Sequence, residues 1–266
     1  MSEMQNTDPA KELVDTLRLL SGADGRRGDD FLAFHFQQNP WSPEFFQILF
    51  EITKRIDLVR TIIKSLETDK ETISLAIQRI NSIQSAFSRE SLNNPWQHVG
   101  YVALSDSNIT PIQMLSAKIR EQHRIPVLSI EEKNEILEMV AELEGWLNEH
   151  QIYEADFIRL AILEGIQVFR LRLVNLNWFG WHSTIESLRQ LVSAYLIMSG
   201  MKPDPNINPI FEVMLQKTQK IFSEIFKKLK LIKEATETYD FYLKWYGAFY
   251  LTKNGVQSAQ HLLTNN

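Results

Sequence analysis

The sequence predicts an all-α protein, a multi-helix bundle of about eight or nine helices. Three observations lead to this prediction. Apolar residues recur three and four positions apart along most of the chain, which is the spacing of one helix face. Capping residues stand before these runs, and glycine or proline stands after several of them. The alternation typical of a strand is absent, except for a short stretch at residues 99–104.

The composition is that of a globular protein able to bury a sizeable core, with 44% hydrophobic and 23% charged residues among 266. The net charge of −5 gives no reason to expect a dedicated nucleic-acid-binding protein. The lack of cysteine excludes disulfides, thiolate zinc sites and thiol catalysis. Neither a secretory signal nor a membrane-spanning run is visible, so we expect a soluble, cytoplasmic protein.

Residues 1–30 are expected to form a short helix and a mobile loop, ahead of one helical domain at 31–266. Asp8 is suited to cap a helix that has Pro9 at its first position and that ends near Leu20. Residues 21–30 are rich in glycine and charge, which predicts a loop.

The next elements are a short aromatic helix at 31–38 and a helical hairpin. Ser42, followed by Pro43, predicts the start of a helix that ends near Leu66. Thr68 or Asp69 starts a second helix. Because only a few residues join the two helices, they should pack antiparallel.

Residues 93–110 interrupt the helical pattern and mark a possible subdomain boundary or lid. A short strand or an extended segment fits residues 99–104. Thr110 and Pro111 then predict the start of a helix that ends near His123.

A capping box of Ser129 and Glu132 begins a helix that runs to about His150. Its predicted inner face consists of Ile136, Val140, Leu143 and Leu147. Farther along the chain, Pro209 opens a helix that ends near Leu231, and a final helix is expected at about 236–254.

We expect a buried hairpin of two helices, residues 153–201, at the centre of the bundle. Its first run is apolar around most of its circumference, and an aromatic turn at 178–182 joins the two runs. On a helical wheel Glu164 and Arg172 fall among apolar residues, where an isolated charge is costly. Two interpretations are open: structural ion pairs with other helices, or a polar pocket inside the bundle.

The second interpretation supplies a set of ligand-binding candidates. In it Glu164 acts as an acid or base, the two arginines bind an anion, and the aromatic turn supplies a wall and a titrating histidine. The candidates are Glu164, Arg170, Arg172, Trp178, Trp181 and His182. We expect no metal and no cofactor, because phosphate loops, nucleophile elbows and metal-ligand spacings are absent.

The final helix carries a double row of aromatic residues on one face, a pattern typical of a core or an oligomer interface. The interface candidates are Phe241, Tyr242, Trp245, Tyr246, Phe249 and Tyr250. Charge is also segregated, with acidic residues concentrated at 131–164 and lysines after Pro209. These two faces could attract each other, or the lysines could contact nucleic acid.

These features lead to two functional hypotheses. The first is a non-enzymatic protein that associates with itself, in the simplest version as a homodimer, or with a protein partner. The alternative is a helical enzyme or small-ligand sensor with a pocket around Glu164, Arg172 and His182. The absence of a catalytic motif favours the first hypothesis but leaves enzymatic activity open.

Overall fold

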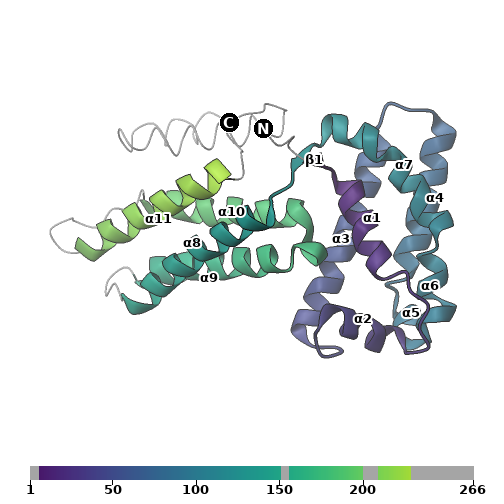
Figure 1. Cartoon of the computed structure of the whole chain (residues 1–266), viewed down its shortest axis with the longest axis horizontal. Coiled ribbons are helices and arrows are strands. Elements are labelled where there is room, and N and C mark those ends of the chain that lie inside the picture. Colours follow the sequence, from purple (N-terminus) through teal and green to yellow (C-terminus); the bar gives the residue numbers. More distant parts are fainter. Residues whose placement is uncertain (1–5, 151–155, 200–208, 229–266) are drawn as a thin grey trace. The chain divides into compact units, whose positions relative to one another are not determined.

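The computed structural model describes residues 6–150, 156–199 and 209–228. Within these ranges the fold is all-α, as predicted, with eleven α-helices, of which nine have nine residues or more (Figure 1). The chain divides into two compact units. Unit 1 comprises Met1–Val127 and Asn175–Thr184, and unit 2 comprises Leu128–Val174 and Ile185–Asn266. This division differs from the expected one, because the first helix belongs to unit 1 and the boundary follows Val127 rather than falling within 93–110.

Unit 1 is built on four helices that pack side by side in Figure 1. They are α1 (Pro9–Leu19), α3 (Pro43–Ser65), α4 (Lys70–Ser85) and α7 (Asp106–Gln122). Shorter elements connect these helices along the chain. They are α2 (Gly28–Phe36), α5 (Arg89–Asn93), the 3₁₀ turn η1 (Trp96–His98) and α6 (Gly100–Ala103). The antiparallel pair of β1 (Asn6–Thr7) and β2 (Ile125–Pro126) joins the two ends of this part of the chain.

Three of the predicted helix starts in unit 1 are confirmed. The side chains of Asp8, Ser42 and Asp69 each accept a hydrogen bond from the backbone N–H three residues later. This contact satisfies one of the donors that a helix N-terminus leaves unpaired. The hairpin of α3 and α4 is likewise present.

Two expectations for residues 93–110 are wrong. Residues 100–103 form the short helix α6 rather than a strand, and α7 begins at Asp106, so that Pro111 lies inside it. The cause is Trp96, which is fully buried. Its indole N–H donates to Leu20 O at 3.1 Å, and its ring stacks on Phe31 at 4.7 Å. These contacts join Trp96 to residues far away in the sequence, and they hold the segment around Trp96 in the core.

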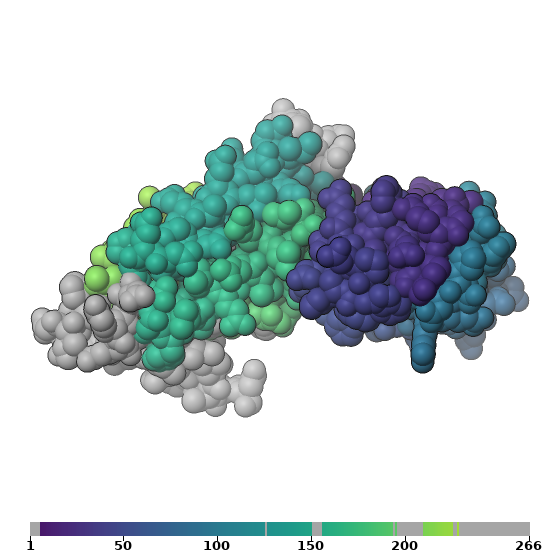
Figure 2. Space-filling view, turned by 90° about the horizontal axis from the view of Figure 1, so that it is seen from below, coloured from purple at the N-terminus to yellow at the C-terminus, as the bar shows by residue number. Residues whose placement is uncertain are grey.

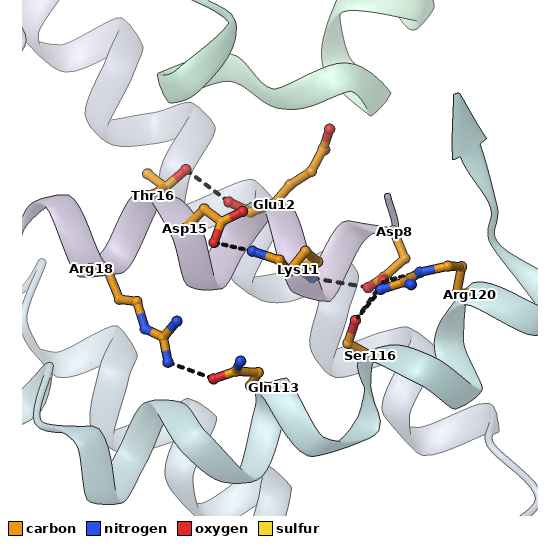
Figure 3. A network of polar contacts seen from close by, with 9 residues as sticks. All are labelled: Asp8, Lys11, Glu12, Asp15, Thr16, Arg18, Gln113, Ser116 and Arg120. Atoms are coloured by element: carbon orange, nitrogen blue, oxygen red, sulfur yellow. Dashed lines mark hydrogen bonds and ion pairs between the residues drawn. The ribbon is translucent and has the colours of Figure 1, made fainter. Parts of the chain in front are cut away.

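The buried carboxylate of Asp8 joins α1 to α7 (Figure 3). Its Oδ1 accepts from the Lys11 backbone N–H at 2.9 Å. Its Oδ2 accepts from Ser116 Oγ at 2.6 Å and from Arg120 Nη2 at 3.1 Å. One side chain thus caps a helix and also forms a tertiary ion pair, which a buried charge requires.

Unit 2 contains α8 (Ile130–Glu149), α9 (Asp156–Val174), α11 (Pro209–Lys228) and most of α10 (Leu176–Ser199). The capping box of Ser129 and Glu132 is present. The predicted inner face of α8 is buried at Ile136, Val140, Leu143 and Leu147. None of the helices in the described ranges combines the length and apolar composition that crossing a bilayer requires.

Helices α8 and α11 bring the acidic and the basic stretch together. Lys228 forms an ion pair with Glu135, and Lys217 Nζ lies 5.8 Å from the centre of the Trp146 ring. The hydroxyl of Tyr195 on α10 donates to Leu215 O of α11 at 3.2 Å, and burial raises the pKa of this tyrosine to about 12. The contacts support the interpretation that the two charged faces attract each other.

Replacing Asp8 by alanine tests its double role. Asp8→Ala should lower the free energy of unfolding by about 2–4 kcal/mol, because it removes a cap and leaves Ser116 and Arg120 without their acceptor. Urea denaturation followed by tryptophan fluorescence measures this loss. Asp69→Ala is the matched control, because Asp69 caps α4 but bonds to no other helix in the described part of the chain. An equal loss in the two variants would show that the contacts to α7 contribute nothing.

Candidate functional site

The six predicted ligand-binding residues fall in different compact units. Glu164, Arg170 and Arg172 belong to unit 2, whereas Trp178, Trp181 and His182 belong to unit 1. Arg170 pairs with Glu144 at 2.8 Å on the surface, and Arg172 is partly buried. The ligand-binding role of these residues stays a prediction. The six interface candidates of the final helix lie outside the described residues.

The expected burial of Glu164 is wrong, because its side chain is exposed. Helix α9 is buried along one face only, and Phe157, beside Glu164 on the wheel, is 62% exposed. Arg159 of the same helix is buried, and it donates to Asp156 and to the Leu147 carbonyl. The wheel of one helix gives the angles between residues but not the direction of its neighbours.

The aromatic turn belongs to the interior of unit 1. Phe179 and Trp181 are buried, and the Trp178 ring meets Phe36 edge-on at 4.9 Å. His182 is exposed. Residues 175–184 therefore complete the core of a unit whose other residues all precede Leu128.

The guanidinium of Arg55 on α3 holds this returning segment. Its Nη1 donates to Asn177 O at 3.2 Å, to Trp178 O at 3.0 Å and to Thr16 Oγ1 at 2.9 Å. Burial lowers the pKa of Arg55, while the nearby Glu12 and Glu51 oppose that shift. A buried arginine keeps its charge, so the carbonyl oxygens are the partners that make its burial possible.

Gly180 allows this close approach. Its φ of 71° and ψ of 165° lie in a region that essentially only glycine adopts. A Cβ at this position would lie 2.8 Å from Arg55 Nε. Both the backbone conformation and the available space therefore require glycine.

Two acidic residues complete the attachment. Glu12 on α1 accepts from the Trp181 backbone N–H at 3.1 Å, and Glu51 on α3 accepts from Ser183 Oγ at 2.8 Å. Burial raises the pKa of Glu12 to about 7, despite the opposing effects of the Arg55 charge and the Trp181 N–H. Figure 3 shows the Glu12 side chain pointing away from the contacts of Asp8 with Ser116 and Arg120.

A half-open pocket of about 400 Å³ lies beside these residues in unit 1. Its polar lining comes from Thr7, Glu12, Asp15, Thr16, Arg55 and Asn177, and its apolar lining from Leu19, Val127, Leu176 and Trp181. The sequence alone did not predict this pocket. Arg55 could have been found on the wheel of its own helix, where it falls between Val59 and Ile62.

A second candidate site is an exposed group of rings on α3 and the residues before it, hereafter the aromatic surface: Trp41, Phe46 and Phe50. Phe46 and Phe50 lie one helical turn apart, and Trp41 is 5.7 Å from the Phe46 ring. All three are more than two-fifths exposed. Figure 2 shows α2 and α3 in indigo at the surface of unit 1.

Trp41 is fixed in an unusual conformation. Its φ of 63° is left-handed, which is rare for a bulky residue. Its indole N–H donates to Asp29 Oδ2 at 2.8 Å, and the buried Asp29 also pairs with Arg27 at 2.8 Å. The ring is thus half-exposed and anchored to a buried charge.

Comparison of the chain with protein-family models, with curated proteins and with solved structures finds no match. Both candidate sites therefore rest on the geometry of this chain.

Substitution of Gly180 tests the attachment of residues 175–184. Gly180→Ala should destabilise the protein by at least about 1–3 kcal/mol, from backbone strain and displacement of Arg55. Gly145→Ala is the control, since Gly145 lies within α8 with nothing within 4 Å of the added Cβ. It should stabilise by about 0.5–1 kcal/mol. Thermal and urea unfolding would report the opposite signs, and a neutral Gly180→Ala would contradict the assignment.

The raised pKa of Glu12 predicts a pH-dependent stability. The folded-state pKa of about 7 lies above the value of 4.5 for a free side chain, so the folded protein binds this proton more tightly. The free energy of unfolding should therefore fall, relative to Glu12→Gln, by about 3 kcal/mol as the pH rises from 4.5 to above 7. Urea titrations across this range test the difference. Glu164→Gln, which removes a carboxylate at an exposed position, is the matched control.

Proposed function

We propose that this protein works by self-association, as a homodimer formed through the aromatic surface of unit 1. The observation that carries the proposal is the left-handed backbone of the half-exposed Trp41. Such a conformation costs a residue with a side chain about 1–2 kcal/mol. The residue is 43% exposed, so part of the ring is available to a partner.

An exposed, fixed tryptophan is suited to protein association. Tryptophan is enriched among the residues that dominate binding energy, because it buries a large area with few rotatable bonds. The bond to Asp29 restricts the ring before binding, which lowers the entropy lost on association. Phe46 and Phe50 extend the apolar contact along α3.

The surface is also self-complementary, as a two-fold interface requires. In an antiparallel pair of α3 helices centred on Phe50, residue 54 of one copy lies opposite residue 46 of the other. Lys54 Nζ already lies 5.5 Å from the centre of its own Phe50 ring. In the pair it would also reach the Phe46 ring of the second copy, another cation–π contact.

In this proposal the protein is a non-enzymatic, cytoplasmic association protein, and the contact between the two copies lies in unit 1. The interface expected at the aromatic final helix stays a separate prediction. The alternative is that a different protein, rather than a second copy of this chain, binds the aromatic surface.

Trp41→Ala tests the homodimer. Light scattering after size exclusion should give twice the chain mass of 31.0 kDa for the wild type at micromolar concentrations. The variant should dimerise at least about 30-fold more weakly, which corresponds to about 2 kcal/mol at a binding hot spot.

Met114→Asp is the matched control, because Met114 is an exposed apolar residue of unit 1 on α7. It should leave the dimer unchanged. Circular dichroism checks that both variants keep their helicity. A wild type that stays monomeric, or a Trp41→Ala variant that dimerises as well as the wild type, would refute the homodimer.

A further inference from the structure

The pocket of unit 1 has a polar floor and an apolar wall, which together fit an amphipathic small molecule. Arg55 lines the pocket, and only 7% of the residue is exposed. Its three hydrogen bonds all use Nη1, so Nη2 has no hydrogen-bond partner among the described residues. Glu12 uses Oε2 for the Trp181 N–H, which leaves Oε1 without a hydrogen bond within the described part of the chain.

The charges around this floor favour an anion when Glu12 is protonated. Two carboxylates are already paired with lysines, Asp15 with Lys11 and Glu51 with Lys54. Asp8 is paired with Arg120. When Glu12 is uncharged, the anions near Arg55 are Glu51 and Asp15, and each of them is already paired with a lysine. The largest balancing charge is then lost, so an anionic ligand would restore the balance around this buried cation.

The apolar wall of the pocket indicates the chemistry of the remaining part of the ligand. Leu19, Val127, Leu176 and the Trp181 ring line the pocket beyond the charged floor. A volume of about 400 Å³ accommodates a few carbon atoms with their head group. An aliphatic tail against these residues would add hydrophobic stabilisation.

We propose that this pocket binds a short-chain monocarboxylate, whose head group accepts hydrogen bonds from Arg55 Nη2 and from the protonated carboxyl of Glu12. Binding of the anion is coupled to uptake of one proton at Glu12. The tail lies against Leu19, Val127 and Leu176. This site is separate from the aromatic surface, so it is tested independently of the homodimer.

The coupling has a definite sign. The pKa of Glu12 is about 7, so about nine-tenths of the side chains are protonated at pH 6 and about one-tenth at pH 8. Affinity should fall about tenfold between these pH values. The charged groups around Glu12 are Asp8, Lys11 and Asp15 at α1, Glu51, Lys54 and Arg55 on α3, and Arg120 on α7. His182 follows Trp181 in the chain, so the pH series is repeated with His182→Gln as a control.

Butyrate is the probe, and the backbone amide of Trp181 in ¹⁵N-labelled full-length protein is the signal. The amide shift should saturate at pH 6 and require about ten times more butyrate at pH 8. Glu12→Gln keeps an acceptor for the Trp181 N–H and a donor for the ligand but cannot ionise. In that variant butyrate should bind at pH 8 as tightly as it binds to the wild type at pH 6.

Two comparisons define the ligand class. Butyramide and butylamine should each bind at least about tenfold more weakly than butyrate at pH 6, because neither supplies the anion. Leu19→Ala should reduce the preference for butyrate over acetate, because it shortens the apolar wall. Leu19 is half-exposed, so this variant keeps the fold.

The proposal is overturned by any of three results in folded protein. They are the absence of a saturable shift with butyrate at pH 6, an affinity that is constant or rises between pH 6 and pH 8, and binding of butylamine in preference to butyrate. The wild-type pH series gives this answer even if Glu12→Gln fails to fold.

Discussion

The buried positive charge of Arg55 is the constraint on which unit 1 depends. A guanidinium inside a protein needs acceptors, and here they are the carbonyl oxygens of Asn177 and Trp178. These atoms come from a segment that follows most of the chain, so residues 6–127 alone cannot satisfy Arg55. The same segment brings Phe179 and Trp181 into the core. One charge thus makes a distant stretch of chain part of the unit, and Gly180 is the residue that lets the backbone come close enough.

The burial of Glu12 is the unfavourable part of this arrangement. Its carboxylate lies close enough to Arg55 to interact electrostatically and accepts from the Trp181 N–H, yet burial outweighs both effects and its pKa rises to about 7. A folded protein retains such a group only where other contacts over-determine the structure. The neighbouring pocket gives this acid access to small molecules, which distinguishes it from Asp8, whose oxygens are engaged by Lys11, Ser116 and Arg120. Two acids on one helix therefore have different roles, set by their surroundings.

Trp41 shows a similar balance between strain and anchoring in another part of unit 1. Its left-handed backbone is held by the bond to Asp29, and the ring remains available to a partner. Both candidate sites thus combine a costly local feature with a buried partner that fixes it. Neither has the form of a linear motif, because residues 12, 55 and 181, or 29 and 41, are brought together by packing.

The sequence by itself determined the all-α class and several of the helix starts. Asp8, Ser42, Asp69 and Ser129 were predicted as caps because capping depends on residues three positions apart. The inner face of α8 followed from spacing for the same reason. Tertiary structure alone decided that Glu164 is exposed, that Trp96 draws residues 93–110 into helices, and that Arg55 meets Asn177. Periodicity gives the angle between side chains on one helix, whereas the direction of burial depends on neighbours that the chain supplies from far away.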